Sequence, residues 1–130
     1  SDLKDQYGLT YVFISHDLGV VRHVADRVMV MYLGRVVESG GASDIFAAPR
    51  PPYTRALLSA TPSTEPGRKS DRIRLKGELP SPFHPPGGCA FHPRCPLAFD
   101  RCRREQPALV GDAGSTVACF AANAPQRQAA

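Results

Sequence analysis

Residues 89–102 read CAFHPRCPLAFDRC, and with Cys119 in the later segment ACF (118–120) they contain all four cysteines of the chain. Successive cysteines are separated by five, six and sixteen residues. The apolar residues around them are too few to stabilise a small fold by burial alone. We therefore expect Cys89, Cys95, Cys102 and Cys119 to converge on one inorganic centre, with the C-terminal half of the chain folded around it.

The spacing of the four cysteines leaves three interpretations open. Four thiolates from separate elements can hold a 4Fe–4S cluster, which needs Cys₄ ligation. A structural zinc ion also takes four cysteines, although zinc modules usually contain close C-x₂₋₄-C pairs, and none occurs here. A zinc set of Cys89, His92, Cys95 and one further cysteine is a variant of this interpretation. The third is two disulfides or four free thiols, of which the disulfides are opposed by a reducing cytosol.

The bulk composition limits the class of protein. The chain has 130 residues and a formal net charge of +4, a mild excess that does not indicate a nucleic-acid partner. It contains no apolar run of membrane-spanning length and no signal-peptide pattern, so we expect a cytoplasmic protein. The chain begins with Ser1, and residues 2–7 read like the end of a helix. We expect a fragment of a longer protein.

Residues 1–60 have the pattern of an α/β domain. Thr10–Ile14 is apolar on both faces, which is typical of a buried parallel strand. Asp17 is placed to cap a following helix, and Gly34 to form a tight turn between two antiparallel strands. The elements expected after the first strand are a helix (18–25), two strands (27–32 and 35–38) and two short helices (42–48 and one opened by Pro51-Pro52).

The triplet Ser15-His16-Asp17 follows the first expected strand directly. Open α/β sheets bind their ligands at the carboxyl ends of strands, which makes His16 a candidate catalytic residue. The alternative is that His16 only packs at a strand–helix corner, and the spacing leaves both open.

The remaining residues divide into a linker (61–71), a cysteine module (72–120) and a flexible tail (121–130). In the module we expect a strand over 72–76, a helix over 96–105 and a strand over 115–120 that positions Cys119. The expected core of the module is Ile73, Leu75, Leu79, Phe91, Leu97, Phe99, Leu109, Val117 and Phe120.

Residues 10–40, TYVFISHDLGVVRHVADRVMVMYLGRVVESG, resemble the end of an ATP-binding subunit of an ABC transporter, and residues 48–62, APRPPYTRALLSATP, resemble its oligopeptide/dipeptide importer branch. The resemblance implies that His16 is the switch histidine that contacts the γ-phosphate of ATP. The chain lacks G-x-x-x-x-G-K-[ST] and the other upstream ATP-binding motifs. ATP and Mg would therefore bind only in the full-length parent, and this fragment alone should be inactive.

The segments GELPSP (77–82), PPGGCAFHPRCPLAFDRC (85–102) and ACF (118–120) are similar to the C-terminal extension of peptide-importer ATPases. This resemblance implies that Cys89, Cys95, Cys102 and Cys119 bind a 4Fe–4S cluster, with zinc as the alternative.

The resemblance as a whole implies a fragment of the ATP-hydrolysing subunit of a peptide importer. Its fold would be the C-terminal part of an ABC-type α/β nucleotide-binding domain followed by a small, loop-rich, cysteine-stapled module. The implied partners are a second ABC ATPase subunit, transmembrane permease subunits and, indirectly, a solute-binding protein, with no nucleic acid. The implied location is the inner face of the bacterial cell membrane. The rival hypothesis is a stand-alone metal-binding interaction module without an ATPase role.

Overall fold

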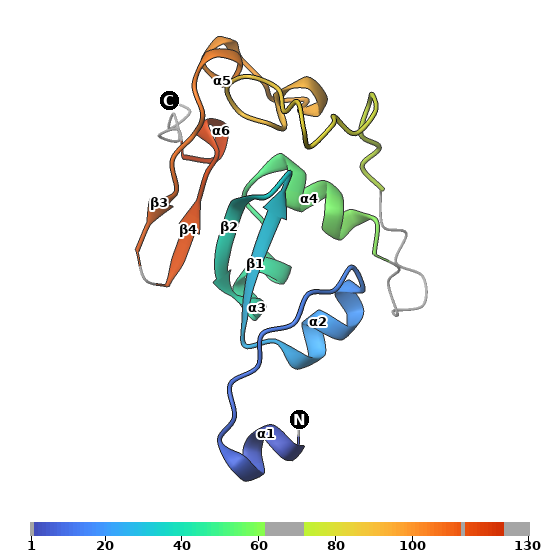
Figure 1. The fold of residues 1–130 in the computed structure, drawn as a ribbon, viewed down its shortest axis with the longest axis vertical. Helices are drawn as coiled ribbons and strands as arrows, with labels where there is room; N and C mark the ends of the chain where they lie inside the picture. Colours follow the sequence, from blue (N-terminus) through green and yellow to red (C-terminus); the bar gives the residue numbers. More distant parts are fainter. Residues whose placement is uncertain (1, 62–71, 113, 124–130) are drawn as a thin grey trace, which may run out of the picture.

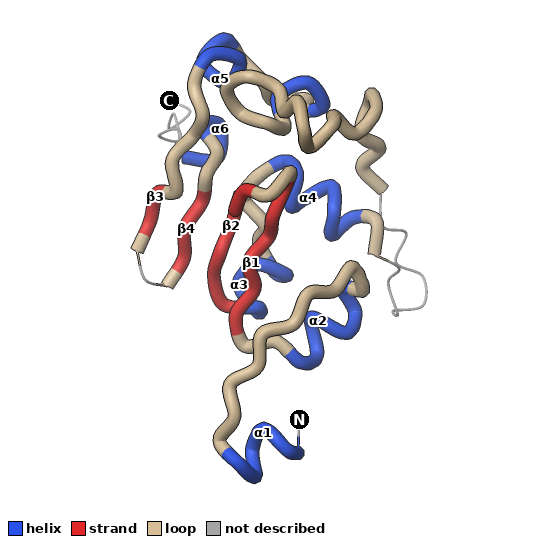
Figure 2. The backbone as a smooth tube through the Cα atoms, viewed as in Figure 1, coloured by secondary structure: helices blue, strands red, loops and turns tan. Residues whose placement is uncertain are grey.

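The computed structural model describes residues 2–61, 72–112 and 114–123 of the chain. They form a mixed α/β fold around a four-stranded antiparallel sheet with the strand order β1-β2-β4-β3 (Figures 1 and 2). The strands are β1 (Arg27–Tyr32), β2 (Arg35–Gly41), β3 (Val110–Gly111) and β4 (Ser115–Val117). The helices are α1 (Asp2–Tyr7), α2 (Leu18–Val24), α3 (Ala42–Ala47), α4 (Pro52–Ser59), the 3₁₀ helix η1 (His92–Arg94), α5 (Asp100–Arg104) and α6 (Phe120–Asn123).

Local signals in the N-terminal half produce the structure expected of them. Leu33 and Gly34 have φ angles of 47° and 77°, the left-handed pair that a two-residue hairpin turn requires between β1 and β2. Asp17 caps α2, and its carboxylate accepts a hydrogen bond from the Val20 N–H at 3.2 Å. The antiparallel hairpin and the cap of α2 are therefore confirmed.

The expected strand at residues 10–14 is wrong. These residues have no regular secondary structure, and the Val12 and Ile14 side chains are 93% and 100% exposed. A strand needs a neighbour to accept and donate its backbone hydrogen bonds, and β1–β4 are the strands of the only sheet that the described residues form. The expected parallel sheet is thus replaced here by an antiparallel one.

Three expectations for the C-terminal half also need correction. Residues 72–76 lie in no strand, and the expected helix over 96–105 begins only at Asp100. Phe99, just before it, has an extended backbone (φ −136°, ψ 177°) that continues no helix. The last strand ends at Val117, and α6 takes up the first residues of the expected tail. Most of the expected linker (62–71) and of the tail (124–130) lies outside the described residues.

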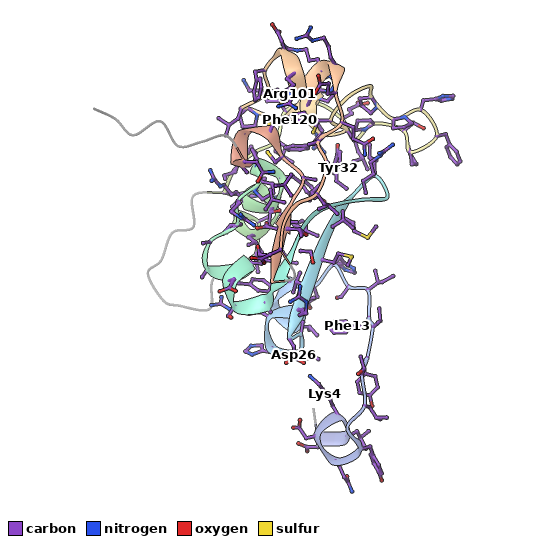
Figure 3. All side chains as sticks on the ribbon, turned by 90° about the vertical axis from the view of Figure 1, so that its left-hand side faces the viewer. Lys4, Phe13, Asp26, Tyr32, Arg101 and Phe120 are labelled. Atoms are coloured by element: carbon purple, nitrogen blue, oxygen red, sulfur yellow. The ribbon has the colours of Figure 1, made fainter. Side chains whose placement is uncertain are left out.

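The N-terminal helix α1 has no buried residue, and an ion pair connects it to the residues before β1. The Lys4 ammonium pairs with the Asp26 carboxylate at the start of β1, as Figure 3 shows. This hydrogen bond is the main cause that raises the pKa of Lys4. None of the helices in the described residues is long and apolar enough to cross a membrane.

The core lies where the two halves of the chain meet. The rings of Tyr32, Tyr53 and Phe91 form a cluster with centroid separations of 4.7–5.3 Å. This cluster joins β1, α4 and the segment between Cys89 and Cys95. Strand β4 adds to β2, with Val117 opposite Glu38 and fully buried. Of the expected module core, only Phe91 and Val117 are buried. The missing apolar contacts come from the N-terminal half.

A buried carboxylate marks the junction of β2 and β4. Glu38 is 2% exposed, accepts a hydrogen bond from the Arg50 N–H at 3.4 Å and lies 3.9 Å from the Arg50 side chain. The Arg50 guanidinium also donates to the Ser115 hydroxyl at 2.7 Å, so it links both strands. Burial raises the pKa of Glu38, and the nearby Thr54 hydroxyl and Arg50 oppose that rise only in part.

Candidate functional site

All four cysteines line a single cavity with about 30 Å³ of free space. Cys89 and Cys95 flank η1, Cys102 is in α5, and Cys119 lies between β4 and α6. Residues far apart in the sequence are thus brought to one place. The lining has apolar walls as well, from Val37, Pro51, Pro52, Tyr53, Phe91, Leu97, Ala118, Phe120 and Ala121.

A backbone hydrogen bond holds two of the cysteine segments together. The Cys89 N–H donates to the Cys102 carbonyl at 2.8 Å. This approach depends on Gly88, which has a φ of 68° and whose Cβ, if it had one, would lie 2.4 Å from the Cys102 carbonyl oxygen. Only glycine fits this position without moving the backbone.

The η1 turn fixes the spacing between Cys89 and Cys95. The His92 N–H donates to the Cys89 carbonyl at 3.1 Å, and the Cys95 N–H donates to the His92 carbonyl at 3.2 Å. The His92 ring also lines the cavity, and its Nδ1 lies 2.8 Å from the Cys89 carbonyl oxygen. This contact leaves Nε2 as the ring atom free for another partner.

Aromatic and cation–π contacts attach α5 to α6. The Arg101 guanidinium lies 4.1 Å from the centroid of the Phe120 ring, and Figure 3 shows the two side chains together. Arg101 also pairs with Glu105 at 2.8 Å, and the Phe99 and Phe120 rings meet edge to face. These contacts hold the segments of Cys102 and Cys119 side by side.

The environment of the cavity favours the neutral thiol at Cys89 and at Cys95. Burial is the main cause that raises the pKa of Cys89 and of Cys95, and the negative charges of the other cysteines add to it. Backbone N–H groups of Phe91 and His92 oppose the rise at Cys89, and that of Leu97 opposes it at Cys95. Four thiolates gathered here therefore require a positive centre between them.

The cysteines are all free thiols in the structure. Among the described residues, no group of three or more His, Cys, Asp and Glu side chains is arranged to hold a metal ion. A zinc ion with ligand bonds of about 2.3 Å needs its sulfurs close together. The four sulfurs line one cavity, but they are not close enough together to bind a single zinc ion.

His16 lies away from the cysteines. It is exposed in the loop before α2, and Figure 1 shows α2 in the lower half of the molecule and α5 at its top. Its neighbours are ordered, because the Ser15 hydroxyl accepts from the Asp17 N–H at 3.0 Å and Asp17 caps α2. Among the described residues, His16 does not line the cysteine cavity, so the role of His16 stays a prediction.

Sequence reasoning missed the part of the site contributed by the N-terminal half, namely Val37, Pro51, Pro52 and Tyr53. One signal for it was present. The expected core of the cysteine module had few large apolar residues, while residues 1–60 contained the large aromatic residues Tyr32 and Tyr53. A core shared between the two parts of the chain buries the residues of both.

Comparison with known proteins identifies the family of the chain. Residues 37–102, half of the chain, match the family described as the oligopeptide/dipeptide transporter, C-terminal region. The chain belongs to this family. The matched segment runs from β2 to Cys102, so it contains three of the four cysteines and most of the cavity wall.

Curated relatives match nearly the whole chain. It is 58% identical over 120 residues to the dipeptide transport ATP-binding protein DppF of Haemophilus influenzae, covering 92% of this chain and 37% of the relative. It is 57% identical over 129 residues to DppF of Escherichia coli, covering 97% and 39%. A probable peptide ABC transporter ATP-binding protein of Sinorhizobium fredii is 55% identical over 119 residues, covering 91% and 34%. The chain thus spans a little over a third of the length of these relatives.

Proposed function

We propose that this chain forms the C-terminal part of an ATP-binding subunit of a peptide importer. The observation that supports this most strongly is the 55–58% identity to peptide and dipeptide transport ATP-binding proteins over more than nine-tenths of the chain. The subunit would pair with a second ATPase subunit and act on membrane permeases at the cytoplasmic face, with a solute-binding protein supplying the peptide. The same identity disfavours a stand-alone metal-binding module.

Within this proposal, His16 contacts the γ-phosphate of ATP in the assembled importer. Its exposed position just ahead of the capped α2 leaves the ring free to meet a ligand bound outside this chain. A donor aimed at the transferring phosphoryl group stabilises charge in the transition state.

The test is ATP hydrolysis by the intact subunit assembled with its permeases in lipid vesicles. We expect His16→Ala to lower the rate by about 10²-fold, the loss typical of one such donor. His23→Ala is the matched control, because His23 is exposed on the neighbouring α2. Equal rates for the two variants would exclude this role of His16.

We further propose that Cys89, Cys95, Cys102 and Cys119 hold a 4Fe–4S cluster. The residues fit this group in three respects: the four cysteines line one cavity, its walls are largely apolar, and backbone N–H groups point at two of the sulfurs. A cluster places several atoms between its ligands, so its cysteines need not be as close as those of a single ion. When bound, it would supply iron–thiolate bonds that tie η1, α5 and the end of β4 together.

This part of the proposal is tested by anaerobic reconstitution of the chain with iron and sulfide. We expect the visible absorption and the electron paramagnetic resonance signal, after reduction, of a 4Fe–4S cluster. Cys102→Ser should abolish or shift both spectra, whereas His92→Ala should leave them unchanged. Loss of the cluster in His92→Ala would mean that the ligand set is a different one.

A further inference from the structure

A second concave surface shares Tyr53 with the cysteine cavity. It runs between α4 and residues 72–75 and has a volume of about 500 Å³. Figure 1 shows this segment beside the C-terminal end of α4. Its floor is apolar, and three arginines line it: Arg72, Arg74 and Arg94. We call it the arginine groove, and it is distinct from the sites of the proposed function.

The groove concentrates positive charge. Of the residues that the structure describes, three arginines and no acidic residue line it. Among the described residues, no carboxylate forms an ion pair with Arg72, Arg74 or Arg94. By contrast, Arg101 and Arg103 on α5 are both paired with carboxylates on their own helix or just after it.

The shape of the groove is held by contacts with its surroundings. The Ile73 N–H donates to the Ser59 hydroxyl at 3.0 Å, which anchors the extended segment to the end of α4. The Arg94 side chain donates to the Lys76 carbonyl at 3.4 Å, which joins the same segment to η1. These two hydrogen bonds hold residues 72–76 to the end of α4 and to η1, and thereby position the arginines beside the floor of the groove.

The floor consists of one face of α4. Leu57 and Ala60 lie on it together with Ala56, and Ile73, which is 43% exposed, faces it from the opposite wall. An occupant must therefore offer apolar side chains as well as negative charge. Carboxylates suit the rim, because guanidinium groups bind them with two parallel hydrogen bonds.

We propose that the arginine groove binds an acidic segment of a partner protein that also carries apolar side chains. Charge complementarity selects the acidic side chains, and the helical floor accepts the apolar ones. A nucleic-acid backbone has phosphates but no apolar side chains for the floor. A bilayer surface is flat and would not enter a groove. A protein segment meets both requirements.

The test measures binding of short fluorescent peptides to the full 130-residue chain by anisotropy. The probe alternates glutamate and leucine; one comparison peptide alternates glutamate and serine, and another lysine and leucine. We expect the glutamate–leucine peptide to bind most tightly, about tenfold more tightly than the glutamate–serine peptide, and the lysine–leucine peptide not to bind. Equal binding of both glutamate peptides would overturn the proposal, since the apolar floor would then play no part.

Two variants test the location. Arg72→Glu combined with Arg74→Glu should weaken binding of the glutamate–leucine peptide by at least about tenfold. Ala60→Glu, at an exposed position at the end of α4, should do the same from the floor of the groove. The matched control is Arg35→Glu combined with Arg104→Glu, which reverses two exposed charges outside the groove and should change the affinity by less than about twofold.

Far-ultraviolet circular dichroism would be used to check that each variant is folded. Unchanged affinity in the folded groove variants would overturn the proposal. So would binding to vesicles of anionic lipid that is lost in the Arg72→Glu, Arg74→Glu variant and is not displaced by the glutamate–leucine peptide, because the groove would then serve a membrane.

Discussion

Apolar segments are usually buried and polar ones exposed, but two segments of this chain, residues 9–14 and residues 88–102, show the opposite. The first segment is almost wholly apolar, yet Val12 and Ile14 are 93% and 100% exposed. The second contains two prolines, a glycine and charged residues, yet Phe91 and Cys102 are 4% and 7% exposed. The difference lies in the surfaces that each segment meets. Residues 88–102 pack against the start of α4, strand β2 and the residues after β4, whereas no strand among the described residues pairs with residues 9–14.

The comparison predicts where the chain is sensitive to substitution. Changes at the contact between the two halves should be costly even though that contact is small. Changes in the apolar segment should be almost without effect in this chain.

Tyr32→Ala should have the largest effect. Tyr32 is 4% exposed and touches both Tyr53 and Phe91, so truncation removes the ring that joins the two halves. We expect a loss of about 3–5 kcal/mol in the free energy of unfolding, measured by urea denaturation. Tyr32→Phe is the control. The Tyr32 hydroxyl is buried without a hydrogen-bond partner among the described residues, so its removal should cost nothing. A large loss in Tyr32→Phe would contradict this assignment.

Gly88→Ala should be nearly as damaging. The new methyl group would meet the Cys102 carbonyl, strain the left-handed backbone and break the hydrogen bond between Cys89 and Cys102. We expect a loss of about 2–4 kcal/mol, from the strain and the lost bond together. The adjacent Gly87→Ala is a matched control, because its methyl group would meet nothing within 4 Å. Similar stability of the two variants would show that the close approach at Gly88 is absent.

Glu38→Gln should change the pH dependence of stability. Because burial raises the pKa of Glu38 in the folded state, the neutral form is the one that folding favours. The stability contributed by the neutral carboxyl is fully present below the unfolded pKa and is lost as the pH rises through the folded pKa. The amide resembles the neutral form, so the wild type should lose stability relative to Glu38→Gln as the pH rises above the ordinary glutamate pKa of about 4.3 and through the raised folded pKa. Parallel curves for the two proteins would exclude this linkage.

Ile14→Asp should have the smallest effect. Its side chain is fully exposed, so the charge adds no burial cost in this chain. We expect a change within about 0.5 kcal/mol, which is typical of surface positions. The same substitution in the intact subunit would be severe if residues 10–14 join a sheet there. A large loss in the 130-residue chain would mean that this segment is already packed.

The sequence predicted features that depend on neighbouring residues. The turn at Leu33-Gly34 needs only two residues with positive φ, and the cap at Asp17 needs only the next helical turn. Both are present. The prolines at positions 51 and 52 likewise mark the start of α4 correctly.

Features that depend on distant partners were predicted less well. Residues 10–14 and 72–76 have strand composition, but a strand forms only when another strand offers its backbone groups. Leu79 and Leu97 were expected in a core and are 64% and 51% exposed. Their expected places are filled by Tyr32 and Tyr53, which no pattern within the cysteine region could reveal.

The candidate site was predicted in part. The clustering of the cysteines in sequence indicated that they would meet, and they line one cavity. Its wall from Val37 to Tyr53 depends on the pairing of β2 with β4, which the sequence alone did not predict. The arginine groove was missed for the same reason, since Arg94 reaches it only when η1 packs beside residues 72–76.

The metal content of the chain decides whether the four cysteines hold one 4Fe–4S cluster. The chain would be purified without oxygen, and iron, acid-labile sulfide and zinc would be measured per polypeptide. We expect iron and sulfide in equal amounts, about four of each per chain, and no zinc. Stoichiometric zinc without iron would exclude the cluster, and so would a chain that contains neither metal and keeps four reactive thiols after reconstitution.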